Sequence, residues 1–198
     1  MIKAIFFDSA GVLLKLDFKL TITNYEKTHV IDSGALYKAM HDYQYWKDFT
    51  LGKITEEKYF QEVMNNFGSD LNVEEIKTLI RDDVISNSEL FDFIKQLKAK
   101  FITGIISNNP REWFDYWAEK YNWSNIFKIK IISSFFGVRK PDIKIFQAAL
   151  KEANVEPEES IYIDDRSDII VGAEQLGIKI LVYKNSNQFK KELNFLLN

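Results

Sequence analysis

The first hydrophobic run of the chain is short and ends in an acid. Residues 5–7 are apolar, Asp8 follows them, and the small residues Ser9, Ala10 and Gly11 come next. Such a run predicts a buried strand, and small residues after it favour a tight turn. This stretch alone leaves two interpretations of Asp8 open, a carboxylate that caps the turn and a reactive group at a strand end.

The segment 16–86 has a different pattern. It lacks strand alternation, and its apolar residues recur three and four positions apart, as on one face of a helix. Thr55 is a natural N-cap for the middle helix of this segment. We therefore predict a small all-helical domain at residues 16–86, inserted into a core domain formed by residues 1–15 and 87–198.

From Ser88 onward, helix patterns alternate with strand patterns. This alternation predicts an α/β fold, a doubly wound, Rossmann-like parallel sheet with helices on both faces. The carboxyl ends of parallel strands share one edge, so Asp8, Ser107 and the pair Asp164–Asp165 should converge there. Strands are expected at residues 101–106, 128–133, 160–163 and 178–183, and helices at residues 88–97, 111–121, 142–153, 169–176 and 189–197.

The acids at this edge suggest a metal site. Asp164 and Asp165 would bring two carboxylates close to Asp8, and like charges so close raise each other's pKa unless a cation compensates. Mg²⁺ suits a site made of carboxylates, a carbonyl and waters. The alternative is that Asp164 and Asp165 cap a helix starting near Ser167, with Asp168 as an acid in its first turn.

Two further side chains suit a phosphate. Lys140 precedes Pro141, and this proline fits the first turn of the next helix. The charge of Lys140 would orient Asp8 and neutralise a phosphoryl oxygen. The alternative is that Lys140 is an ordinary surface lysine. Ser107 ends a strand, and the following helix can be capped by Asn109, with a proline at its first position. The Ser107 hydroxyl is then left for an anion.

The charges of this group balance. Three carboxylates, one Mg²⁺ and one lysine sum to zero before any substrate binds. A phosphate held by the metal, Lys140 and Ser107 would then meet Asp8 with its repulsion screened. This is the setting in which a carboxylate acts as a nucleophile and forms an aspartyl-phosphate.

Four motifs in this order resemble the haloacid dehalogenase superfamily of phosphatases: IFFDSAGVLL, IISNNP, GVRKPDIKIFQAAL and IYIDDRSDIIVGAEQLG. The segment LGKITEEKYFQEV is similar to the small helical cap that this family places after its first motif, so the resemblance spans the whole chain. It implies a catalytic nucleophile at Asp8 and a catalytic charge clamp at Lys140. The other implied groups are Ser107 and Asn108 for substrate binding, and Asp8, the backbone carbonyl of Ala10, Asp164 and Asp165 for Mg²⁺.

Ala10 departs from the family pattern, which places a second Asp there as general acid and then base. The Ala10 carbonyl can still bind Mg²⁺, but protonation of the leaving group and activation of water should each lose roughly 10²–10⁴-fold. We therefore expect a Mg²⁺-dependent phosphatase of a small phosphorylated metabolite, acting through an aspartyl-phosphate on Asp8 and attenuated by Ala10.

Several alternatives remain open. The missing acid could come from His29 or His41 of the cap, although each also fits a surface or packing role. A phosphate-binding protein without turnover is a second possibility. A third is chemistry like that of the phosphonoacetaldehyde hydrolases, which also have Ala at this position; Lys47 or Lys53 would then form a Schiff base, but no matching cap motif is present. Dehalogenation would not need the Asp164–Asp165 pair.

Composition and net charge limit the classes of binding partner and the cellular location that we expect. A net charge of -3 and a pI of about 5.5 give no reason to expect nucleic acid or a membrane surface as partner. The chain has no cysteine, signal-peptide pattern or long apolar run, so a soluble cytoplasmic protein is expected. Its oligomeric state has no signature in the sequence. One aromatic cluster has helical spacing and is expected to pack in the core rather than bind a ligand: Trp113, Phe114, Tyr116, Trp117, Tyr121 and Trp123.

Overall fold

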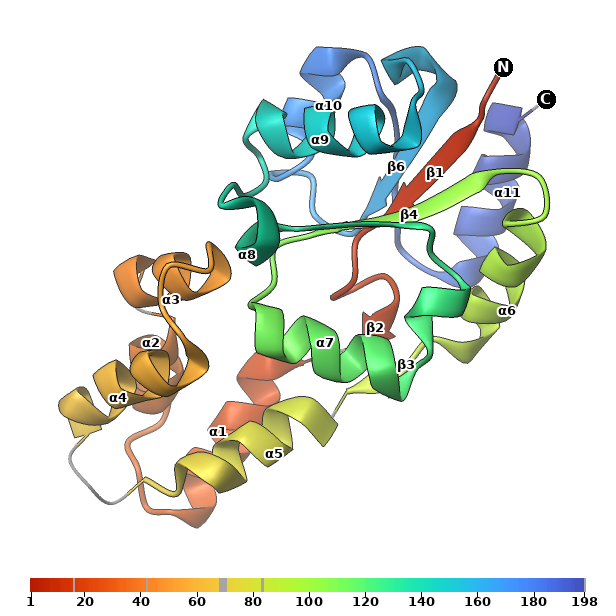
Figure 1. The fold of residues 1–198 in the computed structure, drawn as a ribbon. Helices are drawn as coiled ribbons and strands as arrows, with labels where there is room; N and C mark the ends of the chain where they lie inside the picture. The colour runs from red at the N-terminus through yellow and green to blue at the C-terminus, as the bar shows by residue number, and fades with distance from the viewer. Residues whose placement is uncertain (16, 42, 68–70, 83, 198) are drawn as a thin grey trace.

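A five-stranded parallel sheet forms the centre of the molecule (Figure 1). The computed structural model describes residues 1–15, 17–41, 43–67, 71–82 and 84–197. Within these residues the strand order is β5-β4-β1-β6-β7, and every neighbouring pair is parallel. The predicted doubly wound sheet is therefore confirmed. Its strands are β1 (Ala4–Phe7), β4 (Ile102–Ser107), β5 (Ile129–Ile132), β6 (Ser160–Asp164) and β7 (Lys179–Val182).

The middle strand β1 is buried on both faces. Ile5 and Phe7 belong to one hydrophobic cluster, whereas Ala4 and Phe6 belong to the other, and all four side chains are fully buried. A strand covered on both sides needs apolar residues at every position rather than at alternate ones. This explains the unbroken apolar run that precedes Asp8.

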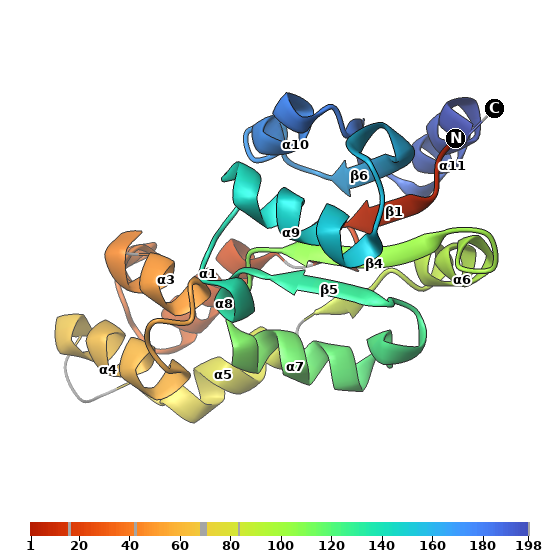
Figure 2. The same cartoon turned by 45° about the horizontal axis from the view of Figure 1, so that its top comes forward.

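Helices cover both faces of the sheet (Figure 2). Buried residues of α6 (Ser88–Leu97), α7 (Arg111–Lys120) and α11 (Ser186–Leu197) join the cluster of Ile5 and Phe7. Residues of α9 (Ile143–Ala153) and α10 (Val171–Leu176) join the other cluster. Three short elements complete the core: η1 (Trp123–Asn125), α8 (Ser133–Phe136) and η2 (Pro157–Glu159).

Two helix starts differ from the sequence-based expectation. The helix expected from residue 169 begins at Val171, so Asp168 lies before it and the prediction of a first-turn acid is wrong. Asp168 pairs instead with the guanidinium of Arg166. The prediction that Pro141 occupies a first turn is also wrong, because Asp142 is the N-cap of α9 and accepts a hydrogen bond from the backbone N–H of Lys144.

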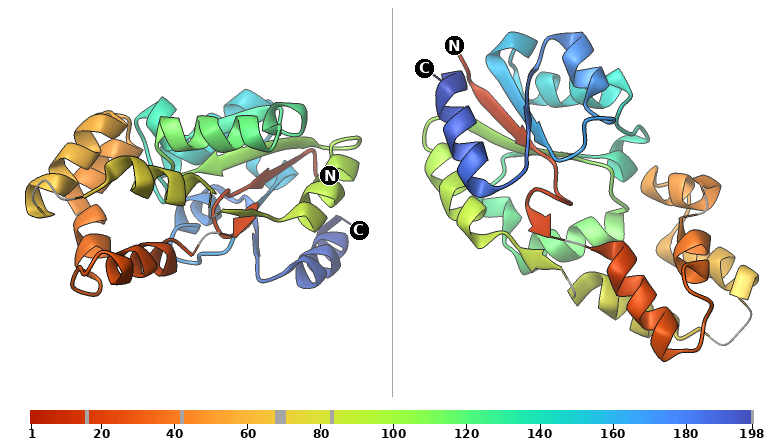
Figure 3. Two further views of the ribbon diagram at one scale, coloured as in Figure 1. Left: turned by 90° about the horizontal axis from the view of Figure 1, so that it is seen from below. Right: turned by 180° about the vertical axis from the view of Figure 1, so that it is seen from behind.

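Five helices lie at one end of the sheet, beyond the carboxyl ends of its strands (Figures 1 and 3). They are inserted between two short strands, β2 (Leu14–Lys15) and β3 (Ile85–Ser86), which pair antiparallel. Thr55 caps the fourth of these helices as predicted, accepting from the backbone N–H of Lys58 at 3.2 Å. These inserted helices are α1 (Phe18–Thr28), α2 (Ala35–Met40), α3 (Tyr43–Thr50), α4 (Glu56–Phe67) and α5 (Val73–Asp82).

Hydrogen bonds from α7 tie the inserted helices to the core. The indole N–H of Trp113 donates to Glu56 Oε1 at 2.8 Å, and that of Trp117 donates to the Arg81 carbonyl at 3.2 Å. Arg81 in turn pairs with Glu56 at 2.8 Å. Because the indoles and the ion pair share partners, they fix α4 and α5 against α7. None of the described helices is both long and apolar enough to cross a membrane.

Candidate active site

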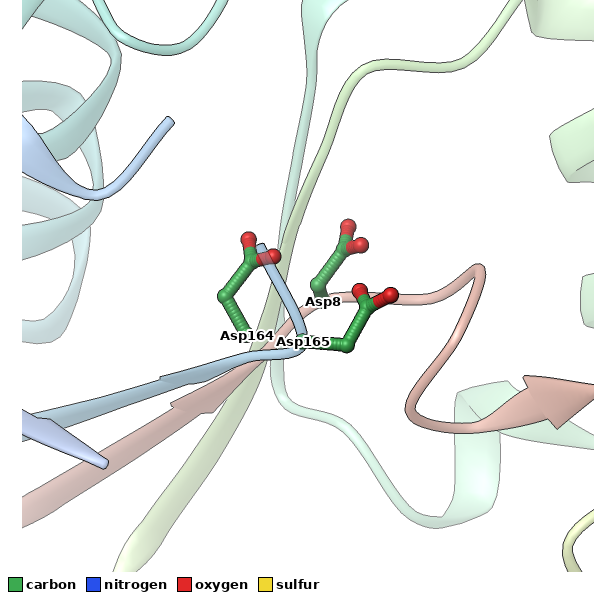
Figure 4. A group of neighbouring side chains, drawn as sticks. All are labelled: Asp8, Asp164 and Asp165. Carbon is green, nitrogen blue, oxygen red and sulfur yellow. The ribbon is translucent and has the colours of Figure 1, made fainter. Parts of the chain in front are cut away.

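Three carboxylates converge at the carboxyl edge of the sheet (Figure 4). Asp8 directly follows β1, Asp164 ends β6, and Asp165 is the next residue. One oxygen from each of the three lies within 4.8 Å of the others. The expected convergence is confirmed, because neighbouring parallel strands deliver their ends to the same place.

Lys140 lies between two of these acids. Its Nζ is 2.8 Å from Asp8 Oδ1 and 2.8 Å from Asp164 Oδ2, and its side chain is 1% exposed. Burial lowers the pKa of Lys140, but the two carboxylates more than offset this effect and raise it above its usual value. Lys140 is thus a buried, charged group, and the surface-lysine alternative is wrong.

Asp164 is held by donors on both of its oxygens. Lys140 and the Tyr162 hydroxyl donate to Oδ2, and the backbone N–H of Arg166 donates to Oδ1 at 3.0 Å. The Lys140 ammonium also donates to the Tyr162 hydroxyl at 2.6 Å. Asp164 therefore anchors Lys140, and it caps no helix. Tyr162 was not predicted as a site residue, although it lies two residues before Asp164 on a strand, so both side chains are on the same face.

The acids carry more negative charge than Lys140 balances. The pKa of Asp8 is raised to about 6, chiefly by burial and also by Asp164, while Lys140 acts in the opposite direction. The pKa of Asp165 is raised too, by burial and by Asp164. Carboxylates in this situation favour an added cation, and their oxygens are the donors that Mg²⁺ prefers. The donor set fits a divalent metal.

Gly11 makes room for Asp165. It has a φ of +90°, and a Cβ at this position would lie 2.3 Å from the Asp165 carboxyl carbon. Glycine is favoured here by its backbone conformation and by the close approach of the acid. The small residue in the opening motif thus permits the carboxylate of Asp165 to turn toward Asp8.

Ser107 belongs to a buried network of polar side chains. Its hydroxyl lies 2.6 Å from the Ser9 hydroxyl, and the Asn109 amide donates to Ser9 at 2.7 Å and to Ser107 at 3.0 Å. Hydrogen bonding from Ser107 also lowers the pKa of Asp8. The prediction that Asn109 caps α7 is wrong, because its amide serves the two hydroxyls and Pro110 is the N-cap residue. No pattern in the sequence pointed to Ser9 as a member of this network.

Asn108 holds the backbone of Lys140. Its Oδ1 accepts from the Lys140 N–H at 2.8 Å, and its Nδ2 donates to the Lys140 carbonyl at 3.0 Å. Both ends of the amide are therefore used to fix the lysine. Asn108 also lines the cavity above Asp8, beside Ser107.

A cavity of about 330 Å³ opens above this cluster, between the sheet edge and the inserted helices. A wider hollow of about 830 Å³ lies at the other end of the strands, but its described lining contains no carboxylate. Asp8 and Lys140 therefore face the smaller cavity. The core contributes nine residues to its lining: Asp8, Ala10, Ser107, Asn108, Asn109, Arg139, Lys140, Arg166 and Ile169. The inserted segment and α7 contribute six rings: Phe18, Tyr37, His41, Trp46, Trp113 and Trp117.

The cavity lining distinguishes between the candidate histidines and lysines of the inserted segment. His41 lines it, whereas His29 stacks on Tyr25 and lies 3.5 Å from Glu75. Lys140 is the one lysine in the described lining, so neither Lys47 nor Lys53 is placed for a Schiff base. Lys53 pairs instead with Asp48 at 3.1 Å.

Four members of the predicted aromatic cluster are buried, as expected. Trp113, Phe114, Trp117 and Trp123 are at most 2% exposed and belong to the larger hydrophobic cluster. Of these four, Trp113 and Trp117 also contribute to the cavity lining. The indoles of Trp113 and Trp117 therefore both pack in the core and line the cavity.

The chain is similar to a hydrolase family and to proteins named as phosphatases. Residues 2–177 match the family model described as haloacid dehalogenase-like hydrolase. Over its full length the chain is 25% identical to the whole D-ribitol-5-phosphate phosphatase of Bacteroides thetaiotaomicron. Half of the chain is 38% identical to 41% of the glyceraldehyde 3-phosphate phosphatase of Pyrococcus furiosus.

Solved structures show the same fold. A haloacid dehalogenase family enzyme of Bacteroides thetaiotaomicron in a magnesium complex superposes with a TM-score of 0.83 at 21% identity, covering 97% of this chain and 98% of the other. Its complex with magnesium and inorganic phosphate gives a TM-score of 0.81 at 22% identity, covering 93% and 95%. The arrangement of sheet and inserted helices is common to these proteins.

Proposed function

The chain belongs to the haloacid dehalogenase-like hydrolases, and on this basis we propose that it is a phosphatase that uses Asp8 to remove phosphate from a small phosphorylated metabolite. The observation that carries the proposal is the contact of Lys140 Nζ with Asp8 Oδ1, 2.8 Å long and facing the cavity. A buried cation beside a carboxylate can hold that carboxylate in position and neutralise an incoming phosphoryl oxygen. Relatives named as phosphatases support the same reaction class.

We propose Mg²⁺ as the cofactor. Asp8, Asp165 and the backbone carbonyl of Ala10 would hold it, with Asp164 within 4.8 Å of both acids but occupied by its own donors. When bound, the ion would supply positive charge to the phosphoryl oxygens and to the crowded carboxylates. The magnesium complexes of structural neighbours support this choice.

The protein groups divide the work. An Asp8 oxygen attacks phosphorus, the bond to the leaving oxygen breaks, and an aspartyl-phosphate forms. Lys140 and the Ser107 hydroxyl bind phosphoryl oxygens, while Asn108 fixes Lys140 through its backbone. Water then attacks the phosphorus of the intermediate, releasing phosphate and restoring Asp8. Ala10 provides neither a proton for the first step nor a base for the second, so we propose attenuated turnover.

We propose that residues 16–86 act as a cap over a core of residues 1–15 and 87–198. The pairing of β2 with β3 supports these boundaries, because Leu14 lies opposite Ser86 where the chain leaves and re-enters the core. Residues of the inserted helices line the cavity above Asp8 and would select the substrate.

Replacement of the nucleophile tests the proposal. Asp8→Asn should abolish hydrolysis of 4-nitrophenyl phosphate in the presence of Mg²⁺, and chelation of the metal should do the same to the wild type. Asp92→Asn is the matched control, because that acid is exposed on α6, pairs with Lys95, and neither residue lines the cavity. Unchanged activity in Asp8→Asn would refute the assignment.

A second candidate is a phosphate-binding protein with little or no turnover. The observation that favours it is Ala10, because the cavity keeps its phosphate-facing groups while position 10 has no ionisable side chain. Binding of inorganic phosphate and Mg²⁺, with no hydrolysis across a broad panel of phosphate esters, would identify this function instead.

A further inference from the structure

We propose that the natural substrate is an aryl phosphate, that is, a phosphate ester whose leaving group is a flat, largely apolar ring. The inference rests on the proposed function and names its substrate class. Two independent features carry it: the rings that face the phosphate site, and the absence of an ionisable side chain at position 10.

The six rings that line the cavity, here termed the aromatic wall, contact one another. Ring centroids of Phe18 and His41 are 4.9 Å apart, those of Trp46 and Trp113 are 5.5 Å apart, and those of Phe18 and Trp113 are 5.9 Å apart. Phe18, Tyr37 and Trp46 remain partly exposed, whereas Trp113 and Trp117 are buried behind them. The aromatic wall is therefore a packed surface whose partly exposed rings can stack on a ligand ring.

Three polar atoms of the aromatic wall are committed to other partners. The indole N–H groups of Trp113 and Trp117 bind Glu56 and the Arg81 carbonyl. The Nδ1 of His41 lies 2.9 Å from the Tyr37 carbonyl. No carboxylate or carboxamide from the described part of the inserted helices lines the cavity. Other polar side chains of the lining, Asn108, Asn109, Arg139 and Arg166, come from the core. A hydroxyl placed against the faces of the rings would lose hydrogen bonds to water, which is costly, whereas an apolar ring would not.

The cavity size suits a substrate with one or two rings. Its volume is about 330 Å³, and a protein cavity of about 150 Å³ is enough to hold benzene. The remaining space accommodates a phosphate group beside Asp8. A dinucleotide or a long chain would not fit without movement of the inserted helices.

The missing acid points to the same class. When Asp8 displaces the ester oxygen, the electron pair of the broken bond leaves on that oxygen. A phenolate carries this charge without a proton donor, since a phenol has a pKa of about 10, whereas an aliphatic alkoxide needs to be protonated as it leaves. Ala10 lines the cavity and supplies no proton. The site therefore selects leaving groups that depart unprotonated.

A substrate comparison tests the inference in the Mg²⁺-loaded protein. The kcat/KM for phenyl and 1-naphthyl phosphate should exceed that for ribitol 5-phosphate and glycerol 3-phosphate by about 10²-fold or more. In Ala10→Asp the gap should narrow, because the new acid helps aliphatic leaving groups most. Equal or better use of the polyol phosphates would overturn the substrate class and leave the phosphatase assignment intact; hydrolysis of none of them would overturn both.

Inhibitor binding separates the aromatic wall from leaving-group reactivity. Phenylphosphonate cannot be hydrolysed, so its Ki reports binding alone. Trp46→Leu and Phe18→Leu should weaken it about 2- to 12-fold relative to inorganic phosphate, as expected for loss of a ring contact. Tyr45→Leu, on the same helix as Trp46 but absent from the cavity lining, is the control. Thermal melts establish that each variant is folded, and an unchanged phenylphosphonate Ki in both folded wall variants would overturn the proposal.

Discussion

Lys140 and Asp164 form an ion pair in the interior of the protein, with Nζ 2.8 Å from Oδ2 and side-chain exposures of 1% and 0%. The same ammonium also contacts Asp8 at 2.8 Å. Two buried carboxylates therefore share one buried cation. Lys140 therefore has two roles: it stabilises the buried acids, and it is the group that we propose binds the phosphate.

Removal of Lys140 should strongly destabilise the fold. Lys140→Ala leaves two buried carboxylates without their partner, and breaking a buried pair in this way typically costs about 3–5 kcal/mol. The measurement is urea unfolding without Mg²⁺ at neutral pH. Lys53→Ala is the matched control: its pair with Asp48 lies at the surface, with Lys53 60% exposed, so no measurable change is expected. Similar free energies of unfolding for the two variants would contradict the prediction.

The stability of the metal-free protein should depend on pH through Asp8. Burial raises the pKa of this carboxyl from 3.8 to about 6, so folding favours its protonated form. Its contribution to stability is therefore fully present below pH 3.8 and is lost as the pH rises through about 6. Without Mg²⁺, Asp8→Asn should be more stable than the wild type at pH 7, and this difference should disappear near pH 4.

Urea titrations of both proteins between pH 4 and pH 7.5 give the difference directly. Adding Mg²⁺ should raise the melting temperature of the wild type more at pH 7.5 than at pH 5, and should have little effect on Asp8→Asn. A difference between the two metal-free proteins that does not change with pH would contradict the pKa assignment of Asp8.

Much of this site follows from the sequence for a simple reason. Asp8, Ser107 and Asp164 each follow directly after a predicted strand, and a parallel sheet brings the carboxyl ends of its strands to one edge, so the three could be placed together from the sequence. The apolar run of β1 also revealed its burial on two faces. At these positions the local sequence pattern and the strand order of the sheet lead to the same arrangement.

The partners of these residues could not be found in this way. Ser9 and Ser107 are 98 residues apart, and Lys140 and Tyr162 are 22 apart, so their contacts depend on how loops leave the sheet edge. Asn109 fitted a helix cap in the sequence, but two nearby hydroxyls bind its amide in the folded protein. A sequence pattern shows that a residue can cap a nearby helix. It does not show that distant side chains will compete for the same amide.

Gly11 should be required for metal binding. A methyl group there would lie 2.3 Å from the Asp165 carboxyl carbon, at a φ of +90°, so Gly11→Ala must displace the acid and strain the turn. We expect Mg²⁺ affinity to fall at least tenfold and stability to drop by about 1–3 kcal/mol. Calorimetric Mg²⁺ titration and urea unfolding measure the two effects.

Gly34→Ala is the control that separates the effect of backbone strain from the effect of a steric clash with Asp165. Gly34 also has a positive φ, +82°, but nothing lies within 4 Å of a Cβ at this position. This variant should therefore lose some stability while its Mg²⁺ affinity remains that of the wild type. Equal Mg²⁺ affinity in Gly11→Ala would show that Asp165 does not need its present position to bind the metal.

Ala10 should make breakdown of the aspartyl-phosphate slow. With 4-nitrophenyl phosphate the first step needs no proton donor, so 4-nitrophenolate should be released quickly, whereas hydrolysis of the intermediate lacks a base to activate water. Rapid mixing should therefore show a burst of about one 4-nitrophenolate per active site, followed by slower turnover. In Ala10→Asp the new carboxylate can act as that base, so the burst should shrink and kcat should rise by about 10²-fold or more. Ala10→Asn is the matched control, because it has nearly the same shape but cannot take a proton, and it should keep the burst. A wild type without a burst, in which Ala10→Asp gives no gain in kcat, would mean that another group, with His41 in the cavity as the first to replace, already activates the water.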